Sequence, residues 1–204
     1  MRMYGRFFAA ALAGLMLLVL PVADGRAENE HLRLESPADM TDAKALEVYQ
    51  RILPSLTEAL GISRDPTATR YHRWTRFNRA PYLSATHGNR FANNYANGTA
   101  ERGGYGRLQP GQRMPVGSVV VKDSFTVTDQ GEVFPGALFF MQKLAAGRSP
   151  KTADWRFAQI LPDGSFLGDT TGDNADEVAF CFTCHKAMAK RDFLFFVPAD
   201  YRRR

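Results

Sequence analysis

The stretch GSVVVKDSFTVT at residues 117–128 indicates the fold class of this chain, because valine, phenylalanine and threonine favour extended strands. Further runs with strand character cover residues 90–97, 137–143 and 155–161. Turn-forming residues separate these runs at Asn97-Gly98, 129–131, Pro135-Gly136 and Asp163-Gly164. Since the connections are too short to hold helical crossovers, the spacing predicts an antiparallel sheet built from hairpins.

A helix is expected ahead of these strands. Apolar residues recur with a 3.6-residue period over residues 45–60, and either Thr41 or Asp42 can cap the start of a helix there. Pro54 lies inside the pattern and is expected to kink or split the helix, whereas Gly61 is expected to end it.

The chain is expected to return to helix near its C-terminus. Residues 176–190 are led by Asp173, Asn174 and Asp176, which suit the first turn of a helix. An apolar run at residues 193–197 is then expected to form a last strand. The predicted fold class is α+β: an antiparallel β-sheet with an N-terminal helix and a C-terminal helix.

Composition excludes several classes of protein. The chain has 204 residues, of which 45% are hydrophobic and 23% charged, so it is neither a disordered nor a fibrous protein. Without residues 1–27 the chain has 23 basic and 20 acidic residues, and this net charge of +3 is too small to suggest a nucleic-acid partner. The 2 cysteines cannot form a disulfide scaffold or a zinc site built from two cysteine pairs.

The N-terminus predicts export. Arg2 and Arg6 precede an uncharged apolar run at residues 7–23, and small residues lead to a cleavage site after Ala27. We therefore expect a signal peptide at residues 1–27 and a mature protein that is periplasmic, with no membrane segment after cleavage. An uncleaved membrane anchor is the alternative.

Residues 181–185 read CFTCH, which is the C-x-x-C-H pattern of c-type haem attachment. Cys181 and Cys184 would lie on one side of a helical turn, so both thiols could add to the vinyl groups of one porphyrin. His185 would then give an imidazole nitrogen to the iron. The motif predicts one covalent haem c and makes the expected C-terminal helix a haem-binding helix, and such attachment agrees with export.

Two other uses of these cysteines stay open. A thioredoxin-like redox pair would place C-x-x-C at the start of a helix after a strand. A zinc site would combine Cys181 and Cys184 with two of the four histidines, which are His31, His72, His87 and His185.

The position of the motif near the C-terminus favours an iron that is open on one side. The only methionine downstream of His185 is Met188, which lies too close along the same helix to reach the opposite face of the ring. A sixth protein ligand would have to come from upstream, where the candidates are His72, His87, Met114 and Met141. A five-coordinate iron would bind small molecules.

An ordered set of motifs resembles the cytochrome P-460 family and its relatives, the beta-type cytochromes c-prime. The motifs are FANNYAN at 91–97, PVGSVVVKD at 115–123, MQK at 141–143, DW at 154–155, CFTCH at 181–185 and DFLF at 192–195. The strand-rich middle of the chain argues against the other candidate, the four-helix cytochromes c-prime. The resemblance covers residues 70–197 and implies a P-460-like haem c domain at residues 70–204, preceded by the N-terminal helical lead-in expected at residues 28–69.

This resemblance also implies a homodimer and a role for Lys122. In the P-460 enzymes the corresponding lysine is bonded to a meso carbon of the porphyrin, which supports oxidation of hydroxylamine. From the residues alone, the alternative is that Lys122 is a solvent-exposed lysine on an edge strand. It would share a sheet face with Val120 and Ser124. Gln142 stands where the family has an acidic residue, and an amide cannot act as a general base near neutral pH.

Three functions follow from these features. The first is a P-460-type enzyme that binds and oxidises hydroxylamine or nitric oxide, with Lys122 and Gln142 as candidate catalytic residues and an external electron acceptor such as another cytochrome. The second is a nitric-oxide-binding cytochrome of the same fold without turnover. The third is an electron carrier with a sixth protein ligand on the iron.

Overall fold

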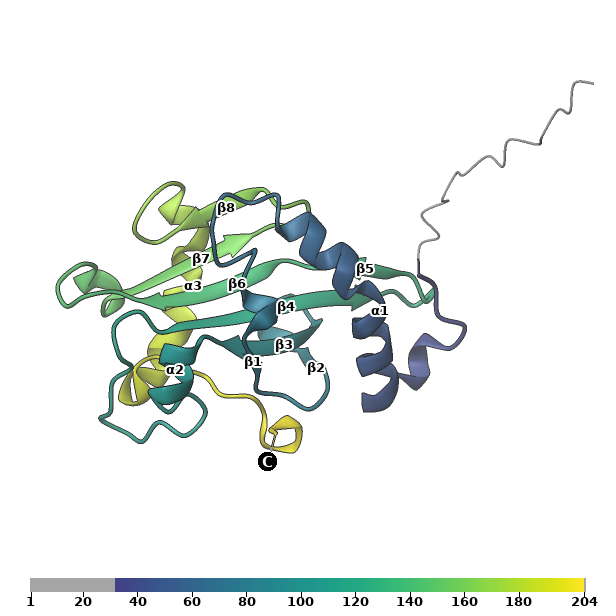
Figure 1. Cartoon of the computed structure of the whole chain (residues 1–204), viewed down its shortest axis with the longest axis horizontal. Helices are drawn as coiled ribbons and strands as arrows, with labels where there is room; N and C mark the ends of the chain where they lie inside the picture. The colour runs from purple at the N-terminus through teal and green to yellow at the C-terminus, as the bar shows by residue number, and fades with distance from the viewer. Residues whose placement is uncertain (1–31, 204) are drawn as a thin grey trace, which may run out of the picture. The chain divides into compact units, whose positions relative to one another are not determined.

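A computed structural model describes residues 32–203, and an antiparallel 8-stranded sheet lies at its centre (Figure 1). The main strand order is β1-β3-β4-β6-β7-β8, while β2 pairs with β3 and β5 pairs with β4. The strands are β1 (Thr75–Arg76), β2 (Tyr82–Ser84), β3 (Arg90–Ala96), β4 (Val119–Val127), β5 (Val133–Pro135), β6 (Leu138–Lys143), β7 (Trp155–Ile160) and β8 (Phe166–Asp169).

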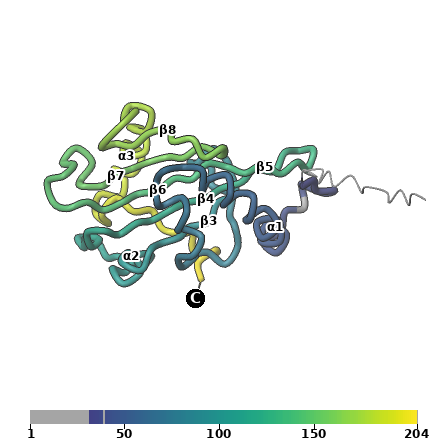
Figure 2. The backbone as a smooth tube through the Cα atoms, turned by 45° about the horizontal axis from the view of Figure 1, so that its top comes forward, coloured from purple at the N-terminus to yellow at the C-terminus, as the bar shows by residue number. Residues whose placement is uncertain are grey.

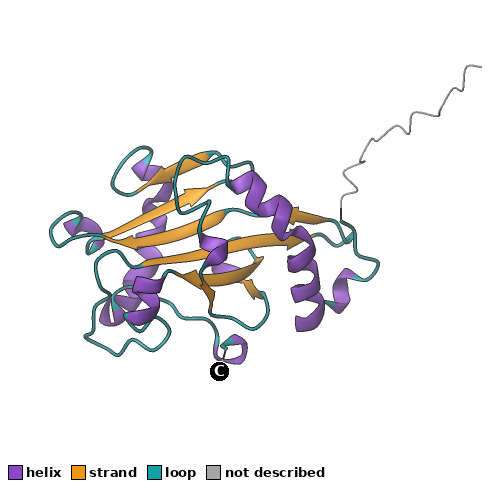
Figure 3. Ribbon diagram, viewed as in Figure 1, coloured by secondary structure: helices purple, strands orange, loops and turns teal. Residues whose placement is uncertain are grey.

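Helices cover the sheet and connect its strands (Figure 3). The α-helices are α1 (Asp42–Leu60), α2 (Gly98–Arg102) and α3 (Ala179–His185). Short 3₁₀ segments are η1 (Pro37–Asp39), η2 (Tyr71–Arg73), η3 (Ala85–His87), η4 (Pro150–Thr152), η5 (Ala175–Val178), η6 (Lys186–Arg191) and η7 (Ala199–Tyr201). The α+β fold class predicted from the sequence is confirmed.

The four predicted strand runs correspond to β3, β4, β6 and β7. The signal peptide expected at residues 1–27 lies outside the described residues. Among the helices of residues 32–203, none has the length and apolar character needed to cross a membrane.

Helix α1 begins and ends where the sequence indicates. The Thr41 hydroxyl accepts a hydrogen bond from the backbone N–H of Lys44 at 3.2 Å, and Gly61 follows the last residue of the helix. The helix is not split at Pro54. Figure 3 shows instead that its axis bends partway along, as expected where proline removes a backbone hydrogen bond.

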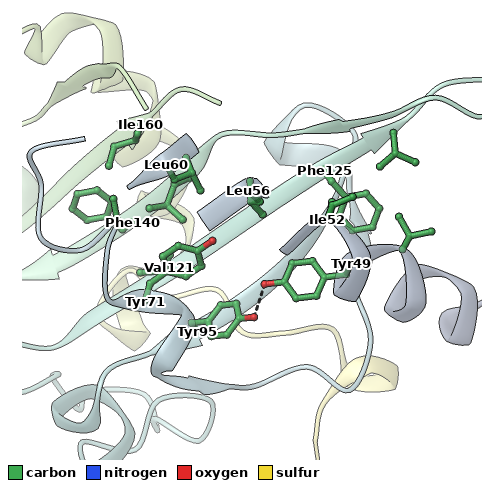
Figure 4. Close-up of a cluster of buried hydrophobic side chains, with 14 of the residues drawn as sticks. Tyr49, Ile52, Leu56, Leu60, Tyr71, Tyr95, Val121, Phe125, Phe140 and Ile160 are labelled. Carbon is green, nitrogen blue, oxygen red and sulfur yellow. Dashed lines mark hydrogen bonds between the residues drawn. The ribbon is translucent and has the colours of Figure 1, made fainter. Parts of the chain in front are cut away.

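The two faces of the sheet carry separate cores, because side chains alternate along each strand. On one face, the apolar side of α1 packs on Val121, Phe125, Phe140 and Ile160 (Figure 4). On the other face, the segment that contains α3 packs on Val120, Met141, Trp155 and Phe157. Residues of the predicted helical lead-in and of the haem domain therefore share a core.

The C-terminal segment departs from the expected strand. After α3 the chain continues as η6, and residues 193–197 form no strand. Asp192 and Phe193 have φ values of 50° and 66°, in the left-handed region, so the chain turns there instead of entering the sheet. Figure 2 shows the yellow C-terminal segment running back along the molecule from α3 to the chain end.

A buried carboxylate lies between α1 and the sheet. Asp123 is fully buried; one of its oxygens accepts a hydrogen bond from Tyr49 Oη at 2.5 Å and the other from Asn93 Nδ2 at 3.0 Å. Tyr49 and Tyr95 also share a hydrogen bond of 2.6 Å, drawn in Figure 4. Burial raises the pKa of Asp123 to about 6, although the hydrogen bonds from Tyr49 and Asn93 oppose this shift.

The first prediction concerns Asp123→Asn. Because the folded pKa of about 6 exceeds the ordinary value of 3.8, the protonated side chain favours the folded state. This stabilisation is complete below pH 3.8 and is lost as the pH rises through 6. The free energy of unfolding of the wild type should fall by about 2 kcal/mol from this group between pH 4 and pH 7.

Asp123→Asn should remove this fall, because an amide does not titrate in that range. Urea denaturation between pH 4 and pH 7 measures it, with Asp129→Asn, an exposed turn residue, as the control. Equal pH slopes in wild type and Asp123→Asn would contradict the assignment.

Candidate haem site

Helix α3 carries both cysteines of the C-x-x-C-H motif. Cys181 is half-buried and Cys184 is exposed, and both are free thiols. Burial raises the pKa of Cys181 to about 11, and the neighbouring Cys184 adds to this rise. A redox-active cysteine pair needs a lowered pKa, and here the helix follows η5 and not a strand. The thioredoxin-like alternative therefore does not fit.

The imidazole of His185 is held in a defined orientation. Its Nδ1 lies 2.7 Å from the backbone oxygen of Phe193, so Nδ1–H donates to that carbonyl and Nε2 keeps its lone pair. The rings of Phe157 and Phe195 each pack edge-on at 5.2 Å. Burial lowers the pKa of His185, so the ring stays in the neutral form that can bind a metal.

The donor set therefore fits a covalently attached haem. Two free thiols three positions apart are followed directly by an imidazole whose Nε2 is available as a ligand. A zinc site has no comparable support, because within residues 32–203 no three His, Cys, Asp or Glu side chains are grouped to hold a metal ion.

A buried ion pair fixes the carbonyl that orients His185. The Asp192 side chain accepts hydrogen bonds from the backbone N–H of Met114 and from Nζ of Lys143, each at 2.8 Å. Arg113 adds a contact of 3.1 Å from the surface. Because Asp192 directly precedes Phe193, its attachment to β6 sets the position of the Phe193 carbonyl. Sequence reasoning missed both Lys143 and Asp192 as site residues, although each lies in a motif noted above.

Lys122 lies on the same sheet face as α3. Its Nζ is 3.4 Å from Nδ1 of His87 and 6.0 Å from the centre of the Tyr82 ring, and Phe139 is its cross-strand partner on β6. No carboxylate among residues 32–203 lies within ion-pair distance of this amine. Burial lowers the pKa of Lys122 to about 8.

This environment contradicts the reading of Lys122 as an edge-strand lysine. Strand β4 is central in the sheet, with β3 on one side and β6 on the other. A half-buried lysine with a pKa of about 8 is neutral in about a tenth of molecules at pH 7, and the neutral amine is a nucleophile.

Gln142 lies on the opposite face of the sheet. It pairs across the strands with Val119 and Arg156, and the Arg156 guanidinium approaches its side-chain oxygen at 3.5 Å. Cross-strand partners share a face, so this register turns Gln142 toward α1 and away from Lys122. The structure does not bring Gln142 together with the other predicted site residues.

The four candidates for a sixth ligand lie in different places. His87 is beside Lys122, while Met141 and Met114 are buried in the core on the α3 side of the sheet. His72 packs against Tyr71, which belongs to the core on the α1 side. Of the two histidine candidates, His87 is the one that contacts a predicted site residue.

The second prediction concerns Asp192→Asn. The change leaves the Lys143 ammonium buried without a counter-ion, which should lower the free energy of unfolding by about 3–5 kcal/mol in urea. The double variant Lys143→Met with Asp192→Asn should recover part of this loss, because no unpaired charge stays buried. Lys151→Met, at an exposed position, is the control. A double variant no more stable than Asp192→Asn would contradict the ion-pair argument.

Comparison with known protein families agrees with this geometry. Residues 69–196 match the family described as Cytochrome P460, and this segment includes Lys122, both cysteines and His185. No curated protein shows a significant match to the chain. Because the matched segment covers more than half of the sequence, the chain belongs to the cytochrome P460 family.

Proposed function

We propose that this haem-binding cytochrome is a periplasmic, homodimeric c-type protein that binds a small nitrogen-containing ligand, hydroxylamine or nitric oxide, and passes electrons to an external acceptor. The observation that carries the proposal is the 2.7 Å contact between His185 Nδ1 and the Phe193 oxygen. It leaves Nε2 of His185 available beside two free thiols. Family membership supports the haem-cytochrome part of this proposal.

Each residue of the motif has a distinct task. The thiols of Cys181 and Cys184 would hold the porphyrin through thioether bonds to its two vinyl groups, and Nε2 of His185 would bind the iron. The haem, when bound, supplies an iron centre that coordinates the small ligand and exchanges electrons with it. The Phe193 carbonyl, kept in place by Asp192, holds the His185 ring in one orientation and one tautomer.

Lys122 is the residue on which the proposed enzymatic activity depends. Its amine has a pKa of about 8 and no carboxylate partner among residues 32–203, so it would be available for a bond to a porphyrin meso carbon if haem is bound. Formation of that C–N bond replaces one C–H and one N–H bond. Two electrons and two protons leave, and dioxygen or a peroxide would have to accept the electrons. A crosslinked ring supports hydroxylamine oxidation.

The surroundings of Lys122 also favour a second function. Its cross-strand partner on β6 is the apolar Phe139, and Nδ1 of His87 lies 3.4 Å from its amine. Because no carboxylate among the described residues lies within ion-pair distance of Lys122 to take a proton from hydroxylamine, a nitric-oxide-binding protein without turnover is the alternative.

The third prediction separates these two functions. A tryptic digest of the secreted holoprotein should yield a haem peptide that contains Cys181, Cys184 and His185 and is joined to the peptide that contains Lys122. Lys122→Arg should keep the two thioether bonds and lose the crosslink, because a guanidinium is not a nucleophile at neutral pH. Lys151→Arg, on the surface, is the matched control.

The measurements are peptide mass and the optical spectrum of the reduced protein. A haem peptide free of the Lys122 segment would favour the nitric-oxide-binding alternative. A chain without any covalent haem would contradict both functions.

The fourth prediction concerns export. If residues 1–27 are a signal peptide, N-terminal sequencing of the protein from periplasmic extract should begin at Glu28. Fractionation with the membrane and retention of Met1 would support the alternative of an uncleaved anchor.

A further inference from the structure

His87 occupies a fixed position between β2 and β3. It is the last residue of η3, and Gly88 and Asn89 follow with φ values of 77° and 54°, which turn the chain back into β3. Ser84 Oγ lies 3.0 Å from its Nδ1. The ring also packs edge-on against Phe139 at 5.1 Å. These contacts hold the imidazole in one place.

This imidazole and that of His185 are directed to the same face of the sheet. His87 contacts Lys122 and Phe139, which form one cross-strand pair. His185 contacts Phe157, which lies on the same face in the adjacent cross-strand row. Consistent with this closeness, burial, Lys122 and His185 together lower the pKa of His87 to about 3, with burial as the largest cause.

Lys122 also decides which nitrogen of His87 carries the proton. Lys122 without the crosslink is mostly protonated at neutral pH and then has three donors and no acceptor, so at 3.4 Å Nδ1 of His87 accepts from it. The Ser84 and Thr86 hydroxyls, at 3.0 Å and 3.2 Å from the same atom, can donate as well. A neutral imidazole that accepts at Nδ1 carries its hydrogen on Nε2. His87 therefore offers a hydrogen-bond donor.

We propose that Nε2–H of His87 donates a hydrogen bond to the small ligand bound at the iron opposite His185. This inference rests on the proposed function. Gln142, the polar candidate catalytic residue named from the sequence, does not compete for this role, because the register places it on the other face. As a donor, His87 stabilises ligands that gain negative charge when bound to iron, such as nitric oxide and carbon monoxide.

Holoprotein variants test the donor with two gaseous probes. His87→Phe should raise the C–O stretching frequency of the ferrous carbon monoxide complex and increase the rate of nitric oxide dissociation about tenfold, as expected for loss of one hydrogen bond. His87→Gln retains an N–H donor and should recover part of both values. His72→Phe is the matched control, because His72 packs against Tyr71 in the core on the other side of the sheet.

A measurement on the wild type covers the case in which His87→Phe does not fold. In D₂O, the iron–ligand vibration of the nitric oxide complex should shift, because the donated proton is exchangeable. Absence of this shift, or wild-type values in a folded His87→Phe holoprotein, would overturn the proposal. A six-coordinate ferrous spectrum that becomes five-coordinate in His87→Phe would also overturn it, since His87 would then be an iron ligand.

The same samples separate this inference from the proposed function. A covalent haem peptide and a five-coordinate ferrous spectrum in the wild type test attachment and the open iron. If both are present and the His87 variants behave as wild type, the His87 inference alone fails. If covalent haem is absent, the proposed function fails first.

Discussion

The buried contact between Lys143 and Asp192 is the constraint on which the site depends. It joins a central strand of the sheet to the turn after the haem-binding motif, at 2.8 Å and shielded from solvent. That turn places the Phe193 carbonyl against His185. Two residues with left-handed backbone conformation sit at this point, and such a conformation persists only where neighbouring contacts enforce it.

Strand β4 places two ionisable side chains on opposite faces of the sheet. Lys122 and Asp123 are adjacent in sequence, yet alternation turns them to opposite faces. Burial lowers the pKa of Lys122 and raises the pKa of Asp123, so on each face it favours the uncharged form of the side chain. The carboxylate is surrounded by tyrosines and an asparagine under α1, whereas the amine faces the side where α3 packs.

Much of the fold and the motif could be predicted from the sequence, because both depend on local patterns. The positions of β3, β4, β6 and β7 follow short runs with strand character between turn-forming residues, and C-x-x-C-H is read directly from residue order. What could not be predicted depends on register and long-range contact. The placement of Gln142 is set by its partners Val119 and Arg156, and the pairing of Asp192 with Lys143 joins residues far apart in the chain.

The register of β4 also limits which length changes this family can tolerate. Adding or deleting one residue inside the strand would exchange the two faces, so that the carboxylate entered the haem side and the amine the tyrosine cluster. Indels in relatives should therefore gather in the loops around residues 103–117 and 144–149 and be absent from β4 itself. The absence of alignment gaps would therefore mark the strand whose register keeps Lys122 on the haem side.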